Sequence, residues 1–170
     1  MLLLFFLDIS KAFDSLSHHI LLAKLKNIGL RGPAYNLIES YLTGRKQFVF
    51  CNGVYSDYKS IKYGVPQGSI LGPILFLIYI NDIIYSTNNV HFTMYADDTS
   101  LIVTGNDLHS LHFKLSQVLN HINNWIKANK VNLNVNKTNV MLFQNRSLSF
   151  ELAPIMLDLI LFIVSTQQNF

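Results

Sequence analysis

The chain has 170 residues, half of them hydrophobic and 14% charged, with a formal net charge of +3. This length fits one domain with an ample core, and the single cysteine, Cys51, excludes an internal disulfide and a zinc site built from cysteines. We therefore expect an intracellular protein. We also expect no membrane segment, because the apolar runs at 2–7, 70–80 and 155–164 are too short to cross about 30 Å of hydrocarbon as helices.

The first predicted element is a strand over residues 2–7. Its unbroken apolar run is typical of a strand buried on both faces, and the run ends on Asp8. An acid at the end of a buried strand is costly unless a positive group meets it. Asp8 is therefore a candidate for a charged site.

Two helices are predicted next. Ser15 or Ser17 can cap the first, which Gly29 ends, and Pro33 begins the second. We expect Asp14 to contribute to the cap of the first helix. Apolar residues recur at helical spacing in both segments, and they are Ile20, Leu21, Leu25 and Ile28, then Leu37, Ile38, Tyr41 and Leu42.

Two β-like runs follow at 47–51 and 58–63, with the strong turn signal Asn52-Gly53 between them. Between residues 24 and 62, seven basic residues outnumber two acids, and aromatic side chains are interleaved with the bases. This pattern suits a polyanion with flat bases to stack on. A solvated surface above a tyrosine-rich core explains the same composition equally well.

A Gly/Pro-rich loop then leads into an apolar helix over residues 64–80. The glycines allow a ligand to approach the backbone closely, and a helix N-terminus favours anions. The segment lacks the Gly-Lys-Ser signature of a phosphate-binding loop. A simple helix-entry loop is the alternative.

Residues 91–104 predict a β-hairpin with Asp97 and Asp98 at or beside its tip. The alternative is that the two adjacent aspartates only form the turn of the hairpin and have no further role. If the strand that ends at Asp8 lies beside this hairpin, three carboxylates converge, and such a cluster binds a hard divalent cation or raises its pKa values.

A long amphipathic helix, capped by Asn106 or Asp107, is predicted from the apolar spacing between Leu108 and Ile126, and a further strand is predicted at 140–143. The order of elements indicates an α+β fold with an antiparallel sheet and helices packed on one face. The hairpin and its carboxylates then lie on the opposite, open side, an arrangement that resembles a polymerase palm.

Four motifs in order carry a specific resemblance. They are Leu7-Asp8-Ile-Ser-Lys-Ala-Phe13-Asp14, Gly64-Val-Pro-Gln67-Gly68-Ser69, Tyr95-Ala-Asp97-Asp98 and Leu133-Asn-Val-Asn-Lys137-Thr. The chain resembles the palm of a reverse transcriptase, motifs A to D, and is most similar to those of non-LTR (LINE-type) retrotransposons. The resemblance covers residues 1–145 and leaves 146–170 as an unassigned apolar tail.

The resemblance implies an RNA-directed DNA polymerase that works with two Mg2+ ions, with Mn2+ as a substitute, on an RNA template, a DNA primer and deoxynucleoside triphosphates. Asp8, Asp97 and Asp98 match the metal ligands, which are also the catalytic aspartates. Lys137 matches a catalytic lysine that helps to protonate pyrophosphate, although a solvated lysine is the plain alternative.

Three further residues match the nucleotide site of the family. Phe13 stands where an aromatic ring excludes a 2′-hydroxyl, and a core phenylalanine is its alternative. Gln67 and Gly68 match the turn that lines the incoming nucleotide and the template.

The fingers and thumb segments of the family have no counterpart in these 170 residues. We therefore expect a palm fragment that is inactive in isolation, and the family resemblance makes the nucleus a plausible location. Two other functions stay open: a catalytically silent nucleic-acid-binding remnant, and an RNA-dependent RNA polymerase palm, against which Phe13 argues.

Overall fold

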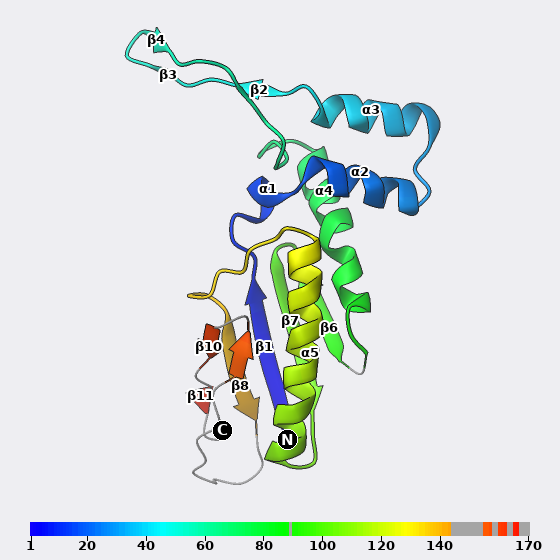
Figure 1. The fold of residues 1–170 in the computed structure, drawn as a ribbon, viewed down its shortest axis with the longest axis vertical. Coiled ribbons are helices and arrows are strands. Elements are labelled where there is room, and N and C mark those ends of the chain that lie inside the picture. The colour runs from blue at the N-terminus through cyan, green and yellow to red at the C-terminus, as the bar shows by residue number, and fades with distance from the viewer. Residues whose placement is uncertain (89, 144–154, 158–159, 163–164, 167–170) are drawn as a thin grey trace. The chain divides into compact units, whose positions relative to one another are not determined.

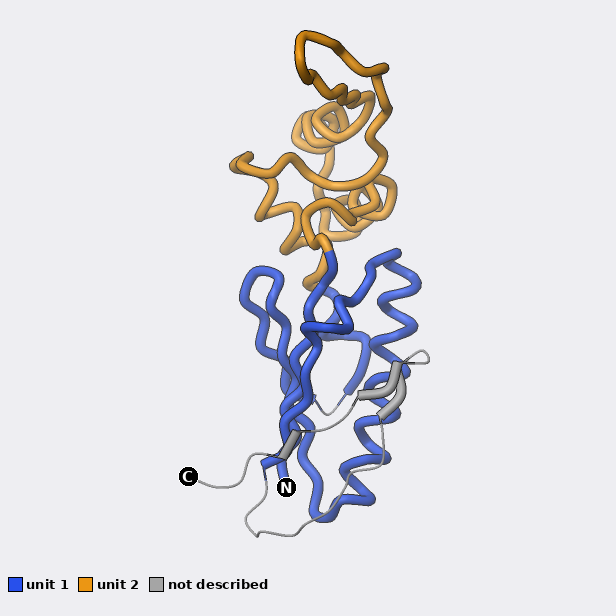
Figure 2. Tube along the Cα trace, turned by 90° about the vertical axis from the view of Figure 1, so that its left-hand side faces the viewer, with its two compact units in different colours: residues 1–10, 82–170 blue, residues 11–81 orange. Residues whose placement is uncertain are grey.

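The computed structural model describes residues 1–88, 90–143, 155–157, 160–162 and 165–166. The chain divides into two compact units (Figure 2). Unit 1 comprises residues 1–10 and 82–170, and unit 2 comprises residues 11–81. Unit 2 is thus an insertion in the sequence of unit 1.

A five-stranded sheet organises the described part of unit 1 (Figure 1). In spatial order its strands are β11 (Ser165–Thr166), β8 (Asn139–Phe143), β1 (Leu2–Asp8), β7 (Asp98–Thr104) and β6 (His91–Tyr95). All neighbours pair antiparallel except β11 and β8, which pair parallel. The predicted hairpin and the predicted strand at 140–143 are therefore confirmed.

The central strand β1 is buried on one face only. Leu3, Phe5 and Leu7 are at most 3% exposed, whereas Phe6 between them is 37% exposed. The expectation of a strand buried on both faces is therefore wrong. An unbroken apolar run does not distinguish the two cases, and an antiparallel sheet such as this one commonly has one face packed on the core and the other solvated.

The long helix α5 (Leu108–Ala128) covers the buried face of the sheet. Six of its apolar side chains are buried, and they are Leu111, Leu115, Val118, Leu119, Ile122 and Ile126. Asp107 caps the helix in a capping box, in which its carboxylate accepts the Ser110 backbone N–H at 2.8 Å. The amphipathic helix and its cap are both confirmed. The Trp125 indole N–H also donates to Asp82 at 3.0 Å.

Three short elements complete the description of unit 1. The 3-10 helix η1 (Asn81–Tyr85) connects the units along the chain. Strands β9 (Ile155–Leu157) and β10 (Ile160–Phe162) pair antiparallel as a separate two-stranded sheet. Much of the tail expected at 146–170 lies outside the described residues. Within the described ranges, no helix is both long and apolar enough to cross a membrane.

Unit 2 contains four α-helices in the part that is described. They are α1 (Ala12–Ser15), α2 (His18–Asn27), α3 (Gly32–Leu42) and α4 (Leu71–Ile80). Both helices predicted after the first strand are present, but Ile28 is 65% exposed and Leu37 is 67% exposed, so these two do not belong to the buried faces. Asp14 lies inside α1 rather than at the cap of α2, where Ser17 stands without a side-chain capping bond.

A narrow two-stranded arm extends between α3 and α4 in the sequence, and Figure 1 shows it projecting from the helices of its own unit. Its base is the pair β2 (Lys46–Gln47) and β5 (Lys59–Ser60), and its end is the pair β3 (Phe50–Cys51) and β4 (Val54–Tyr55). Asn52 and Gly53, both at positive φ, form the turn as predicted.

Candidate active site

The register of the sheet brings Asp8 directly opposite Asp98. These residues are the last of β1 and the first of β7. Directly opposed residues in an antiparallel pair have Cα atoms about 4.5–5.5 Å apart and side chains on the same face. The predicted meeting of Asp8 with the hairpin is therefore present in the backbone pairing.

Asp97 occupies the turn itself. Tyr95 pairs with Asp98, so Ala96 and Asp97 are the two turn residues, and Ala96 takes the left-handed conformation with φ of 51°. A two-residue turn of this kind matches the right-handed twist of its strands. The hairpin therefore presents Asp97 and Asp98 at its very end, where both are exposed.

Asp8 and Asp98, called the acid pair below, place like charges opposite each other. Within the ranges that the structure describes, no hydrogen bond or ion pair engages the carboxylates of Asp8, Asp97 or Asp98, and Asp8 is half-buried. Like charges directly opposite each other in a sheet destabilise it. A cation held between them would remove that penalty.

The arrangement is open rather than a closed metal cage. Among the described residues, no group of three or more His, Cys, Asp or Glu side chains is placed to hold a metal ion. Mg2+ is usually bound through one or two carboxylates, with waters and substrate phosphates as the other ligands. The opposed pair Asp8 and Asp98 fits that mode.

The segment that contains Lys137 is fastened to the end of β1. The Asn134 backbone N–H donates to the Asp8 carbonyl at 2.8 Å, and the Asp8 N–H donates to the Thr138 hydroxyl at 3.5 Å. Thr138 is buried, and its hydroxyl donates in turn to the Asn134 carbonyl at 2.9 Å. Lys137 itself is exposed. Sequence reasoning missed Thr138, because its partner lies at the other end of the chain.

In unit 2, the three residues that match the nucleotide site share one cavity of about 420 Å³. Phe13 lines it together with Gln67 and Gly68, and the rest of the lining comes from the same loop and the start of α4. The Phe13 ring is half-buried, and its centroid lies 4.9 Å from that of Phe76. One face of the ring is thus supported by the core of unit 2, while the ring still borders the cavity.

Two backbone hydrogen bonds bring the loop to Phe13. The Gly64 N–H donates to Leu16 at 2.7 Å, and the Val65 N–H donates to Phe13 at 2.8 Å. Gly64 has φ of +80°, and a Cβ there would lie 2.9 Å from the Asp14 Cα. Only glycine fits this position without strain.

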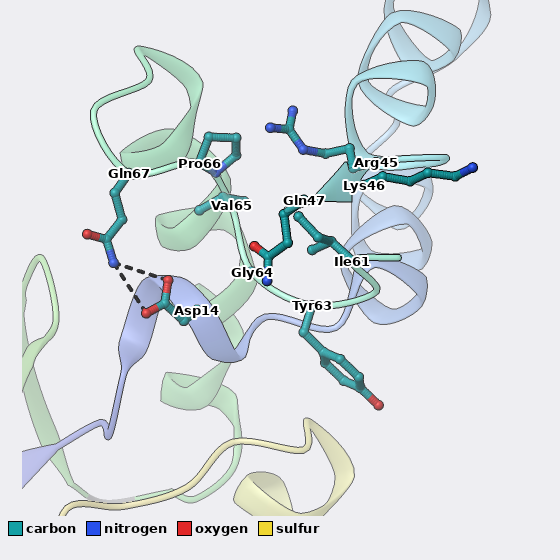
Figure 3. Close-up of a pocket in the computed structure, with 10 residues that line it drawn as sticks. All are labelled: Asp14, Arg45, Lys46, Gln47, Ile61, Tyr63, Gly64, Val65, Pro66 and Gln67. Atoms are coloured by element: carbon teal, nitrogen blue, oxygen red, sulfur yellow. Dashed lines mark hydrogen bonds between the residues drawn. The ribbon is translucent and has the colours of Figure 1, made fainter. Parts of the chain in front are cut away.

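Asp14 engages the neighbouring glutamine. The Gln67 side-chain amide donates to both carboxylate oxygens of Asp14, at 3.1 and 3.2 Å (Figure 3). Both residues border a second cavity of about 580 Å³, to which Arg45 and Lys46 contribute positive charge. Sequence reasoning missed this partnership, because no local signal links positions so far apart in the chain.

The sequence profile of the family described as "Reverse transcriptase (RNA-dependent DNA polymerase)" matches residues 2–168. The chain belongs to the reverse transcriptase family. The match extends past residue 145, where the motif-based boundary was expected. Membership of this family implies a polymerase that needs a divalent metal ion.

The curated relatives of this reverse transcriptase domain come from non-LTR retrotransposons. The probable RNA-directed DNA polymerase from transposon BS of Drosophila melanogaster is 31% identical over 160 residues, which is 90% of this chain and 18% of that protein. The RNA-directed DNA polymerase from mobile element jockey of the same species is 32% identical over 149 residues, or 84% of this chain and 16% of that protein. The chain thus spans less than a fifth of the length of these relatives.

The fold of the reverse transcriptase domain is similar to that of a solved telomerase. The structure of telomerase from Candida tropicalis in complex with a fragment of telomeric RNA superposes with a TM-score of 0.66 at 15% identity, over 89% of this chain and 27% of that one. The predicted α+β palm-type fold is therefore confirmed.

Proposed function

We propose that the chain supplies the catalytic palm for RNA-directed DNA synthesis, and that Asp8, Asp97 and Asp98 bind Mg2+. The single observation that carries this proposal is the opposition of Asp8 and Asp98 in the sheet register, with Asp97 in the adjoining turn. Two bound Mg2+ ions would activate the attacking 3′-hydroxyl and neutralise charge on the leaving pyrophosphate.

The sheet sets the positions of Asp8 and Asp98 before any metal ion binds. The α5 core and the 131–138 segment hold the end of β1 in one register, so Asp8 and Asp98 keep their opposed positions in the backbone pairing. Their mutual repulsion raises the affinity for a divalent cation, because binding removes an unfavourable contact. Lys137 lies within the same segment and is proposed to give a proton to pyrophosphate.

We propose that the cavity beside Phe13 receives the incoming deoxynucleotide. Phe13 would exclude a 2′-hydroxyl, and Gln67 and Gly68 would border the nucleotide and the template. Asp14 is a positioning residue in this proposal, because its carboxylate holds the Gln67 amide by two hydrogen bonds. The backbone of the loop approaches the cavity closely at Gly68, which is exposed.

The proposed partners are an RNA template, a DNA primer and deoxynucleoside triphosphates. Membership of the reverse transcriptase family and the similarity to RNA-directed DNA polymerases of retrotransposons support this choice. The remaining parts of the polymerase, fingers and thumb, would contribute to the grip on template and triphosphate, and the nucleus is the proposed place of action.

Metal binding tests the acid site without any need for polymerase activity. Mn2+ titrated into the chain and followed by electron paramagnetic resonance should show saturable binding that Asp8→Asn and Asp98→Asn each weaken strongly. Asp57→Asn, which neutralises an exposed acid on the arm, is the matched control and should bind Mn2+ as the unchanged chain does. Equal binding by all four proteins would overturn the metal site and favour a catalytically silent nucleic-acid-binding remnant.

Nucleotide selection tests the Phe13 cavity. The affinity for fluorescent dATP should exceed that for ATP, and Phe13→Val should reduce this preference because the smaller side chain leaves room for a 2′-hydroxyl. Asp14→Ala should weaken both nucleotides, and Asp14→Asn should restore part of the affinity, because an amide oxygen still accepts from Gln67. A preference for ATP in the unchanged chain would instead support an RNA-dependent RNA polymerase palm.

A further inference from the structure

Four aromatic rings form a continuous series along the arm of unit 2. Tyr58 contacts Phe48 with centroids 5.1 Å apart, Phe48 contacts Tyr55 at 5.3 Å, and Tyr55 contacts Phe50 at 4.5 Å. We call Tyr58, Phe48, Tyr55 and Phe50 the aromatic ladder. It lies outside both cavities described above, whose linings include none of the four rings.

The ladder is exposed to solvent along its length. The exposed fractions are 44% for Phe48, 57% for Phe50, 66% for Tyr55 and 68% for Tyr58. Aromatic side chains usually contribute their large surfaces to cores or interfaces. A contiguous set that stays this exposed marks a surface for a ligand or a partner.

The backbone of the arm gives the ladder a fixed spacing. Between the two short strand pairs, the Ser56 N–H donates to the Val49 carbonyl at 2.9 Å, and the Val49 N–H donates to the Ser56 hydroxyl at 2.8 Å. These bonds connect the two sides of the arm across the gap between its strand pairs. Hydrogen bonds between the two sides of the arm therefore hold the backbone that carries the rings.

Positive charge accompanies the rings. Residues 45–62 include four bases and one acid, Asp57. Lys46 and Lys59 are both exposed and stand on the paired strands at the base of the arm, since Gln47 pairs with Lys59 and Lys46 with Ser60. Figure 3 shows the Arg45 and Lys46 side chains extending in different directions from that base.

We propose that the aromatic ladder is a binding surface for single-stranded nucleic acid, on which bases stack against the rings while Lys46 and Lys59 contact phosphates. Exposed aromatics combined with basic residues are the features of surfaces that bind single strands without sequence preference. A protein-docking patch fits less well, because lysine is depleted at protein interfaces. The ladder does not need the acid pair, so this proposal stands apart from the catalytic one.

Fluorescence anisotropy with a labelled oligodeoxyadenylate of about 12 nucleotides tests the ladder. Tyr58→Ala should weaken binding by about tenfold, whereas Tyr58→Phe should preserve it because the ring remains. Tyr85→Ala, which removes an exposed aromatic side chain in unit 1, is the matched control and should leave the affinity unchanged. An abasic strand with the same phosphates should bind the unchanged chain and Tyr58→Ala equally.

Salt dependence separates the lysines from the rings. Lys59→Gln should reduce the slope of log affinity against log salt by about 0.7, the value for one phosphate contact on a single strand. Tyr58→Ala should leave that slope unchanged, and Lys130→Gln, at an exposed lysine of unit 1, should change neither slope nor affinity.

Two results would overturn the proposal. One is equal affinity of Tyr58→Ala, Lys59→Gln and the unchanged chain for the oligonucleotide. The other is loss of concentration-dependent self-association in Tyr58→Ala with oligonucleotide affinity unchanged, which would make the ladder a protein contact. Mn2+ binding should be the same in all of these variants, so failure of the ladder is distinguishable from failure of the acid site.

Discussion

The two units use their apolar residues in different ways. In unit 1, Leu3, Phe5 and Leu101 are completely buried beneath α5, and the sheet that they stabilise sets the register of Asp8 and Asp98. In unit 2, the arm leaves Tyr55 and Tyr58 about two-thirds exposed. A high hydrophobic content therefore does not measure the size of a core, because part of it here forms surface.

The largest expected effect is on stability, and it compares a buried aromatic residue of unit 1 with an exposed one on the arm of unit 2. Phe5→Ala should lower the free energy of unfolding by about 3–5 kcal/mol, because it removes a fully buried ring from the core. Tyr55→Ala should change it by only about 0.5–1.5 kcal/mol, because it removes exposed ring contacts and no buried surface of a core. Urea denaturation followed by circular dichroism measures both. Similar losses of unfolding free energy in the two variants would mean that Tyr55 is packed in a core rather than exposed on the arm.

The next effect concerns the loop of unit 2. Gly64→Ala should destabilise the chain by about 1–3 kcal/mol, because the residue has positive φ and a Cβ would press on the Asp14 backbone. Gly53→Ala is the matched control, since Gly53 has φ of +79° but nothing within 4 Å of an added Cβ. The difference between the two denaturation curves isolates the contact from the strain. Equal losses would show that strain alone accounts for Gly64.

A smaller effect of opposite sign is expected at the acid pair. Asp98→Asn should stabilise the metal-free chain by roughly 0.2–1 kcal/mol at low salt, because it removes like charges that face each other across β1 and β7. This gain in stability should shrink when Mn2+ is added, because the bound cation then neutralises the repulsion between Asp8 and Asp98 in the unchanged chain. Thermal denaturation in chelator and in Mn2+ measures the difference. A variant less stable than the unchanged chain in chelator would contradict the repulsion.

The smallest effect is a pH dependence at the start of α5. The Ser110 backbone N–H that donates to Asp107 lowers the pKa of this carboxyl below its ordinary value. A lowered pKa stabilises the fold above the pKa of the unfolded chain, and that contribution is lost as the pH falls through the folded value. Asp107→Ala should therefore have a lower melting temperature near neutral pH, and the gap should narrow in acid. Asp107→Asn, which still caps, should lose less.

The sequence predicts features that rest on local signals. The hairpin at 91–104, the turn at Asn52-Gly53 and the capped helix α5 are all present, because turn residues, cap residues and apolar spacing act over a few positions. Burial was predicted less well. Nothing local reveals that Leu37 faces solvent or that β1 has an open face.

The candidate site divides in the same way. The sequence motifs identify the aspartates and the loop at 64–69, and the pairing of β1 with β7 then places Asp8 opposite Asp98. The side-chain partners that hold the site could not be predicted. The Gln67 amide donates a hydrogen bond to Asp14, and the Thr138 hydroxyl accepts one from the Asp8 N–H at the end of β1. These contacts form because the folded backbone brings distant segments together. Residue types alone do not specify such pairs.

The position of β1 in its sheet has a consequence during synthesis. Both of its antiparallel neighbours, β7 and β8, follow the inserted unit in the sequence, so β1 finds its first partner only after Thr104 has been made and its second only after Phe143. At ordinary rates of translation the first wait is on the order of ten seconds. Throughout that interval the backbone edges of β1 have no strand partner, so this apolar segment stays open to aggregation until its neighbours are made.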